Sequence, residues 1–304
     1  MGKQIRWIPL LVAAALLVGC TRGPSSVPQS LTHDGIERSY RIHVPSSYDE
    51  ATPVPLVLVL HGRLGTGRSV ERWTRFTPVA EEHGFIVVYP DGINRQWNNG
   101  RDPDSRNMTV SEVDDVGFLL ALIDQLGEQY TIDSSAVFVT GMSNGGMMSH
   151  RLATDAPDVF AAIAPVVSSI PEGQAEAWSE GPPVPVLMIN GTNDWLVPPE
   201  GGNMFGREGY GVVLSAQDTE ALWAVRNGCA EAVITEIEPA SRRSRVYIET
   251  YACEDAPLVV YQIEGGGHTW PGGVRFQLQW VLGPVNRDFE ASRVIWEFFD
   301  ANRS

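Results

Sequence analysis

The chain has 304 residues and is 43% hydrophobic, which is enough for one large domain with a substantial core. Its 37 acidic residues outnumber its 22 basic residues, and the net charge is −15 at pH 7. This charge argues against nucleic-acid binding and against adsorption to anionic lipid by charge. No Cys/His spacing fits a zinc site, so we expect no metal, and nothing in the composition implies a cofactor.

The first 19 residues have the composition of a targeting segment. Lys3 and Arg6 make the start positive, and residues 8–18 form an apolar run of 11 residues, which is too short to span a bilayer. The run ends in Leu17-Val18-Gly19-Cys20, which resembles a bacterial lipobox. In that motif a small residue precedes the cleavage site and the cysteine thiol takes the lipid.

We therefore expect residues 1–19 to be a lipoprotein signal peptide and Cys20 to be lipidated, with membrane contact only through this anchor. Ordinary secretory cleavage beside an incidental cysteine is the alternative. Processing removes Lys3 and Arg6 and changes the net charge from −15 to −17. Residues 20–35 are rich in Ser, Pro and Gly and are interpreted as a disordered tether. Residues 36–304 are then one folded domain.

Apolar, β-prone runs alternate with helical stretches after the tether. This alternation predicts an α/β fold with a mostly parallel central sheet and helices on both faces. An early buried strand is expected at residues 57–60, and the turn His61-Gly62-Arg63-Leu64-Gly65 follows it. His61 is interpreted as structural, with its ring bonded to nearby backbone. No long helical insertion is evident, so we expect no large lid.

The paired carboxylates Asp114 and Asp115 are compatible with a metal or acid–base site, or with the start of a helix. Ser111 and Asp114 have the spacing of a capping box, and an apolar run follows at residues 116–123. This pattern favours the start of a helix.

Gly141-Met142-Ser143-Asn144-Gly145 is the most informative segment of the chain. Residues 136–140 before it are typical of a buried strand, and residues 146–153 after it are typical of a helix start. Strand, sharp turn and helix form the setting of a nucleophile elbow, in which glycines leave room for a strained turn. The pentapeptide alone is weak evidence, because an idle serine in a glycine-rich turn gives the same pattern.

A serine nucleophile needs a base, and the base needs an acid that orients it. In folds with a nucleophile elbow these follow in the chain order Ser, Asp or Glu, His. Asp194 follows a predicted strand at residues 186–190, and His268 lies in a glycine-rich loop after another at residues 258–263. Active-site groups cluster beyond the carboxyl ends of such strands. Order and placement therefore predict Ser143, Asp194 and His268 as a catalytic triad.

Two backbone N–H groups are expected to form the oxyanion hole. One belongs to Asn144, directly after the nucleophile. The other belongs to the loop after residues 57–60, with Arg63 as the first choice and Leu64 as the alternative. The glycine-rich stretch at residues 201–211 is expected to be a surface loop at the rim of the site.

Cys229 and Cys253 are the only cysteines after Cys20. An even pair in an exported protein predicts a disulfide between them, and two buried free thiols are the alternative. Cys253 precedes the strand that leads to His268, so the bridge is expected to brace the histidine loop.

Beyond the triad, the chain resembles the α/β-hydrolase esterases that include polyhydroxybutyrate depolymerases and the feruloyl and acetylxylan esterases of carbohydrate esterase family 1. The Gly-His-Thr-Trp-Pro-Gly segment and the Val-Asp-Asp-Val segment are specific for this group, whereas the elbow alone is not. The resemblance covers about residues 30–300. The matching segments are 60–62, 89–92, 97–98, 113–118, 141–146, 191–194 and 266–272.

The resemblance implies an α/β-hydrolase fold, a serine esterase domain at residues 36–304 and no cofactor. It places Trp97 and Trp270 near the site, where we expect an aromatic wall for an acyl or aryl group. One departure is that Arg63 and Leu64 stand where small or polar residues are expected. Arg63 is therefore expected to charge the acyl side of the pocket.

The targeting segment and the triad favour a serine esterase of the cell envelope or extracellular space, and the resemblance implies that it hydrolyses feruloyl or acetyl esters on plant polysaccharides. A polyhydroxybutyrate or other polyester depolymerase is the alternative within the same class. A catalytically silent cell-surface carbohydrate-binding module is the alternative from another class. The complete triad argues against a silent module, because binding alone does not need all three residues. The sequence predicts no oligomeric state.

Overall fold

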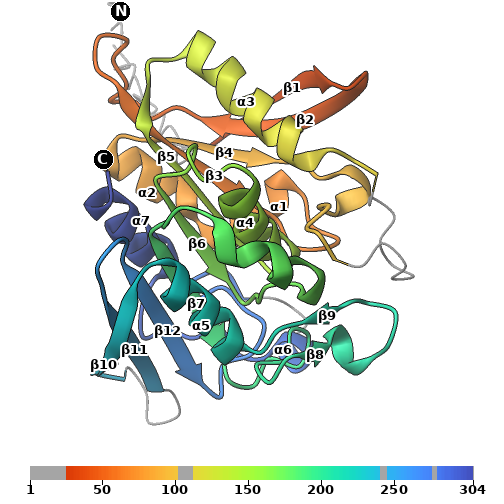
Figure 1. Ribbon diagram of the computed structural model, residues 1–304. Helices are drawn as coiled ribbons and strands as arrows, with labels where there is room; N and C mark the ends of the chain where they lie inside the picture. Colours follow the sequence, from red (N-terminus) through yellow and green to blue (C-terminus); the bar gives the residue numbers. More distant parts are fainter. Residues whose placement is uncertain (1–24, 102–111, 240–244, 276–278, 304) are drawn as a thin grey trace, which may run out of the picture.

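The computed structural model describes residues 25–101, 112–239, 245–275 and 279–303. These residues form a ten-stranded sheet in the order β1-β2-β4-β3-β5-β6-β7-β12-β11-β10, with helices on both faces (Figure 1). The strands are β1 (Val27–His33), β2 (Ile36–His43), β3 (Val54–Leu60), β4 (Ile86–Pro90), β5 (Ile132–Met142), β6 (Ala162–Val166), β7 (Val186–Gly191), β10 (Cys229–Ile237), β11 (Arg245–Cys253) and β12 (Leu258–Glu264).

The centre of the sheet is parallel and its two edges are antiparallel. The strands β4, β3, β5, β6, β7 and β12 pair in parallel, while β1 and β2 flank one side and β11 and β10 the other. The predicted mostly parallel α/β sheet is confirmed. The α-helices are α1 (Gly67–Thr74), α2 (Phe76–His83), α3 (Asp115–Gln129), α4 (Asn144–Asp155), α5 (Ala216–Arg226), α6 (Gln279–Leu282) and α7 (Ala291–Ala301).

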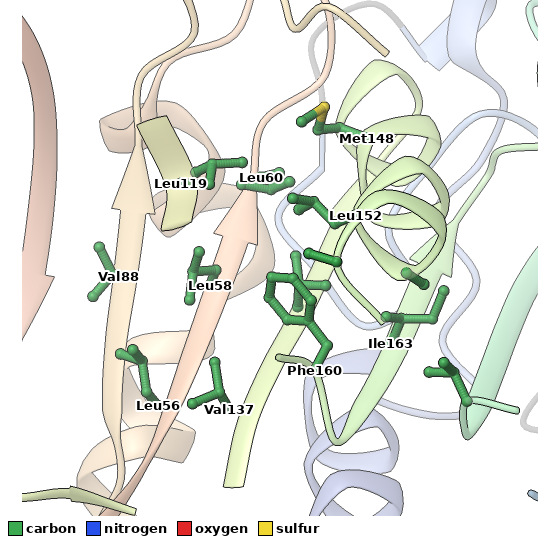
Figure 2. Close-up of a cluster of buried hydrophobic side chains, with 14 of the residues drawn as sticks. Leu56, Leu58, Leu60, Val88, Leu119, Val137, Met148, Leu152, Phe160 and Ile163 are labelled. Atoms are coloured by element: carbon green, nitrogen blue, oxygen red, sulfur yellow. The ribbon is translucent and has the colours of Figure 1, made fainter. Parts of the chain in front are cut away.

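Different helices cover the two faces of the sheet. On β3, residues 56, 58 and 60 belong to one buried cluster with residues of α3, α4 and α5, while residues 57 and 59 belong to a second cluster with residues of α1, α2 and α7 on the other face. Figure 2 shows Leu60 close to Leu119 of α3 and to Met148 and Leu152 of α4. A strand buried on both faces needs apolar residues at every position, which explains the uninterrupted run on β3.

The tether predicted at residues 20–35 is wrong in its second half. β1 begins at Val27 and pairs with β2 along its whole length. Asp34 and Gly35, with φ of 49° and 74°, form the two-residue turn between them. Asp-Gly is a strong hairpin signal because both residues tolerate positive φ, but the Ser- and Pro-rich composition concealed it. The folded domain therefore begins before residue 36, while the predicted signal peptide and Cys20 lie outside the described residues.

Asp114 and Asp115 have the structural roles that the sequence favoured. Asp114 is the N-cap of α3 and accepts a hydrogen bond from the Gly117 N–H at 2.8 Å. Asp115 is 1% exposed and forms an ion pair with the buried Arg38. Ser111, the other member of the predicted capping box, lies outside the described residues.

Cys229 on β10 and Cys253 on β11 form a disulfide, with their Cα atoms 3.7 Å apart. The predicted bridge is therefore confirmed. β11 pairs directly with β12, the strand that leads to the loop of His268.

The described residues also include three 3-10 helices, and a small hairpin occupies the predicted rim loop. The hairpin consists of β8 (Gly202–Asn203) and β9 (Val212–Val213), with η3 (Met204–Gly206) between them. The other two 3-10 helices are η1 (Ile93–Arg95) and η2 (Glu172–Glu180). Among the helices in the described ranges, none has the length and apolar character needed to cross a membrane.

Candidate active site

Ser143 lies at the sharp turn between β5 and α4. Its backbone has φ 55° and ψ −121°, a conformation that residues other than glycine rarely adopt. The residue is 8% exposed. Strain held at one residue between two rigid elements is typical of functional sites, and here it raises the serine above the end of the strand.

The glycines around Ser143 allow α4 to pack tightly against β5 and β3. A Cβ on Gly141 would lie 2.6 Å from the backbone of Gly145, and one on Gly145 would lie 2.4 Å from the Leu60 carbonyl oxygen. Real Cβ atoms do not approach backbone so closely, so any larger residue would force the elbow open. The glycine pattern of the motif therefore follows from packing.

Asp194 and His268 are joined by a hydrogen bond. His268 Nδ1 and Asp194 Oδ2 are 2.6 Å apart, and the two residues are 6% and 4% exposed. The other carboxylate oxygen accepts hydrogen bonds from the backbone N–H groups of Leu196 at 2.9 Å and Val197 at 3.1 Å. Because one oxygen is fixed by the backbone, the other is held in place to orient the imidazole.

The three predicted triad residues lie at one edge of the sheet. Ser143 follows β5, Asp194 follows β7 and His268 follows β12, and these parallel strands lie within the run β5-β6-β7-β12. The hydrogen bonds among the described residues join His268 to Asp194 but include none from Ser143 to His268. Catalytic hydrogen bonds are often long before a substrate is bound.

Hydrogen bonds in the loop before α1 distinguish the two candidates for the second oxyanion donor. The Leu64 N–H donates to the Arg95 carbonyl oxygen at 2.9 Å, so it is unavailable to a substrate. This contact favours Arg63 over Leu64. Asn144, the other predicted donor, is the first residue of α4, where backbone N–H groups lack helical partners.

The buried His61 side chain contacts the backbone of this loop and fixes its position. Its ring is fully buried, with Nδ1 2.8 Å from the Gly62 carbonyl oxygen and Nε2 accepting the Gly92 N–H at 2.9 Å. Burial lowers the pKa of His61, which favours the neutral ring. These contacts agree with a structural role in positioning the Gly62–Arg63 backbone.

The predicted aromatic wall of Trp97 and Trp270 is wrong. The two residues are 0% and 1% exposed, so neither ring faces a substrate. The indole N–H of Trp97 donates to the His61 carbonyl oxygen at 2.9 Å, and that of Trp270 donates to Ser292 Oγ at 3.1 Å. A buried indole requires such a partner, and both rings support the active-site loops from the interior.

The Asn144 side chain links Trp97 to the elbow. Its Oδ1 accepts the Trp97 N–H at 2.7 Å, and its Nδ2 donates to the Trp97 carbonyl oxygen at 3.2 Å. The loop that carries Trp97 is thereby fixed to the first turn of α4.

A different aromatic pair, Phe205 and Tyr210, lies between the active-site loops. Their half-buried rings are 4.8 Å apart. The Phe205 N–H donates to the Leu196 carbonyl oxygen at 2.9 Å, and the Arg63 guanidinium carbon lies 5.7 Å from the Tyr210 ring centre. The glycine-rich composition predicts only a rim loop here, and the two aromatic residues within it are the signal of an ordered surface.

Apolar residues connect that hairpin to the elbow helix. Met147 of α4 packs in one cluster with Val197, Met204 and Val213, and Phe205 and Tyr210 pack against this cluster. The hairpin therefore spans from the loop of Arg63, across α4, to the loop that carries Asp194.

Two exposed tryptophans lie beside the histidine loop. Trp195 is 51% exposed, and its indole N–H donates to the Val281 carbonyl oxygen at 2.6 Å. Trp280, the residue before Val281, is 84% exposed. The same segment contacts the histidine loop, because Thr269 Oγ1 donates to the Pro284 carbonyl oxygen at 3.1 Å.

Comparison with known proteins agrees with this geometry. The model of the prolyl oligopeptidase family matches residues 73–171, which include the elbow. Among solved structures, the acetyl xylan esterase from Aspergillus awamori has the same fold, with a TM-score of 0.60 and 19% identity over 90% of this chain and 99% of that one.

Two sequence relatives cover most of the chain. It is 26% identical to feruloyl esterase D of Neurospora crassa over 306 residues, which cover 96% of this chain and 92% of the relative. It is 32% identical to NocK of Nocardia uniformis subsp. tsuyamanensis, a protein named as an esterase, over 276 residues that cover 87% of this chain and 79% of NocK. The chain therefore belongs to the α/β-hydrolase esterase family of NocK and the feruloyl esterases, and it is a carboxylic ester hydrolase.

Proposed function

We propose that the chain is an exported serine esterase that uses Ser143, His268 and Asp194 to remove feruloyl or acetyl groups from plant polysaccharides. The hydrogen bond between His268 and Asp194 carries this proposal, because it joins two loops at the sheet edge where the strained serine lies. A base fixed by a buried acid beside an elbow serine is the arrangement that acyl transfer requires.

In the proposed reaction, Ser143 Oγ attacks the ester carbonyl carbon and its proton passes to His268 Nε2. The bond to the alcohol then breaks, and the alcohol leaves with that proton. Water attacks the acyl-enzyme and gives a proton to the same nitrogen, and the acid is released as Ser143 Oγ recovers its proton. Asp194 keeps Nδ1 protonated and stabilises the imidazolium that forms in each half of the reaction.

The backbone N–H groups of Asn144 and Arg63 hold the negative charge that develops on the carbonyl oxygen. Loss of one such donor typically raises the barrier by about 3 kcal/mol. The His61 contacts support this role, because they fix the Gly62–Arg63 backbone before the substrate arrives.

Phe205 and Tyr210 supply the aromatic surface for the acyl group. Their hairpin bridges the Asp194 loop and Arg63, and we place the flat acyl ring of the substrate against these two side chains. Aromatic pairs contribute roughly 0.5–1.5 kcal/mol beyond the burial of area. The relatives named as feruloyl esterases support an aromatic acyl group.

Trp195 and Trp280 supply a rim for the rest of the substrate. Both side chains are exposed, and they lie in segments that contact each other and the histidine loop. Flat apolar faces of sugar rings fit such a rim. A polyester chain also fits it, so a polyester depolymerase remains the second candidate.

Export is supported by the disulfide between Cys229 and Cys253, because disulfides persist in oxidising compartments. We propose that the protein is exported as a lipoprotein that is anchored through a lipid on Cys20. Mass spectrometry of the mature N-terminus tests it, since an unmodified Cys20 would contradict the anchor.

A substrate panel tests the proposed function. The panel consists of 4-nitrophenyl acetate, methyl ferulate, acetylated xylan and hydroxybutyrate oligomers, each measured as kcat/KM with Ser143→Ala as the blank. We expect turnover of ferulate and acetylated xylan. Highest efficiency on hydroxybutyrate oligomers would assign a polyester depolymerase instead, and equal rates with Ser143→Ala would contradict the assigned nucleophile.

A further inference from the structure

Three arginines stand together on the surface of a chain whose net charge is −15. Arg68 and Arg72 lie one helical turn apart on α1, and Arg75 follows the end of that helix. All three are exposed, and within the described ranges none of their side chains forms an ion pair or a hydrogen bond.

These arginines line an open hollow together with Arg41, Glu71 and Ser25. Glu71 is already engaged, because Oε2 accepts hydrogen bonds from Ser26 Oγ at 2.6 Å and Arg41 Nε at 3.1 Å. The hollow is lined by four guanidinium groups and by one carboxylate, that of Glu71, so it carries an excess of positive charge. The site has the character of an anion-binding surface.

The hollow lies where the described chain begins. Ser25 lines it, and Ser26 is fixed there by Glu71 and by Arg41, whose Nη2 donates to the Ser26 carbonyl oxygen at 2.6 Å. Cys20 is five residues before Ser25. Five extended residues span at most about 17 Å, so a lipid on Cys20 would keep this surface close to the membrane.

We propose that Arg41, Arg68, Arg72 and Arg75 bind the phosphate groups of anionic lipids and orient the esterase on the membrane that holds its anchor. This inference rests on the proposed lipidation of Cys20. The arginine fork pairs well with phosphate oxygens, and each basic residue near an anionic leaflet strengthens membrane partition about fivefold.

The acidic remainder of the protein does not oppose this contact strongly. Charge interactions decay over about 8 Å at physiological ionic strength, so only the surface nearest the lipid is attracted or repelled. The expectation that the chain is not drawn to anionic lipid by charge therefore holds for its average charge but not for this surface.

Vesicle sedimentation tests the proposal without the lipid anchor. The protein is the chain from residue 20 with Cys20→Ser, which keeps every described strand and helix. It is compared with the same chain carrying Arg68→Gln, Arg72→Gln and Arg75→Gln, and with a control carrying Arg207→Gln, Arg245→Gln and Arg303→Gln. The control loses the same charge elsewhere on the surface, and melting temperatures confirm that all three proteins are folded.

Vesicles of phosphatidylcholine alone and with phosphatidylglycerol are the probes. We expect binding only to the vesicles with phosphatidylglycerol, weakened at least tenfold in the patch variant but not in the control. Equal binding of the two variants, or no preference for phosphatidylglycerol, would overturn the proposal. Patch-dependent binding to polygalacturonate without binding to vesicles would overturn it too, by assigning the surface to an acidic polysaccharide. Absence of lipid on Cys20 refutes the anchor separately.

Discussion

The proposed chemical centre and the proposed recognition rim of this esterase are built in different ways. The proposed triad lies on short loops directly after buried parallel strands, and each member is less than a tenth exposed. The rim consists of the β8–β9 hairpin and the exposed tryptophans beside the histidine loop. The centre follows from local sequence and strand order, whereas the rim depends on how separate loops pack over that edge.

The largest effect is expected at the centre. Ser143→Ala should lower kcat by at least about 10⁴-fold on every ester, because the nucleophile is lost while the fold is kept. Ser30→Ala on β1 is a matched control and should retain full activity. Retention of more than a few per cent of activity in Ser143→Ala would place the nucleophile elsewhere and break the comparison.

Asp194→Asn tests the link to the histidine. The Leu196 and Val197 N–H groups still find an oxygen, so the amide should occupy the same position. Its NH₂ group then faces Nδ1 and disfavours the tautomer that His268 needs, and kcat should fall by about 10⁴-fold at neutral pH. Single-turnover kinetics should show slow acylation with little change in substrate binding. Normal acylation in this variant would mean that another acid orients His268.

The rim should change selectivity rather than chemistry. Phe205→Ala combined with Tyr210→Ala should reduce kcat/KM for methyl ferulate about tenfold relative to 4-nitrophenyl acetate, because a flat acyl ring loses its stacking surface. The ratio between the two esters is the readout, so a general loss of activity does not count. An unchanged ratio would remove this pair from the acyl site.

What the sequence could predict follows the same division. The elbow, the strand order and the glycines that pack at backbone distance are local features, so Ser143, Asp194 and His268 could be named in advance as candidates, and the structure brings His268 and Asp194 together. Trp97 and Trp270 were assigned to a wall because they are near the site in sequence motifs, but proximity does not decide which side of a loop faces solvent. The Asp34-Gly35 hairpin was readable, whereas the path of the β8–β9 hairpin over α4 depends on tertiary contacts.

Trp97→Phe separates the interior tryptophans from the rim. It removes the indole donor and leaves the buried His61 carbonyl oxygen unsatisfied, which should cost about 2 kcal/mol of unfolding free energy. Activity toward ferulate and acetate should fall together, so the ratio of their kcat/KM values should stay constant. A shift in that ratio without a loss of stability in urea would restore Trp97 to the pocket.

The smallest effect is expected from the exposed tryptophans. Trp195→Ala combined with Trp280→Ala should reduce kcat/KM on acetylated xylan about fivefold, because stacking on a sugar ring is worth roughly 1 kcal/mol. The rate on 4-nitrophenyl acetate should not change, since that ester has no part that reaches beyond the histidine loop. Ile234→Ala, at a side chain 62% exposed on β10, controls for the loss of an exposed apolar group. Equal losses of kcat/KM on the polymer and on the small ester would show that these tryptophans support the loops of Asp194 and His268. They would then belong to the chemical centre and not to the rim.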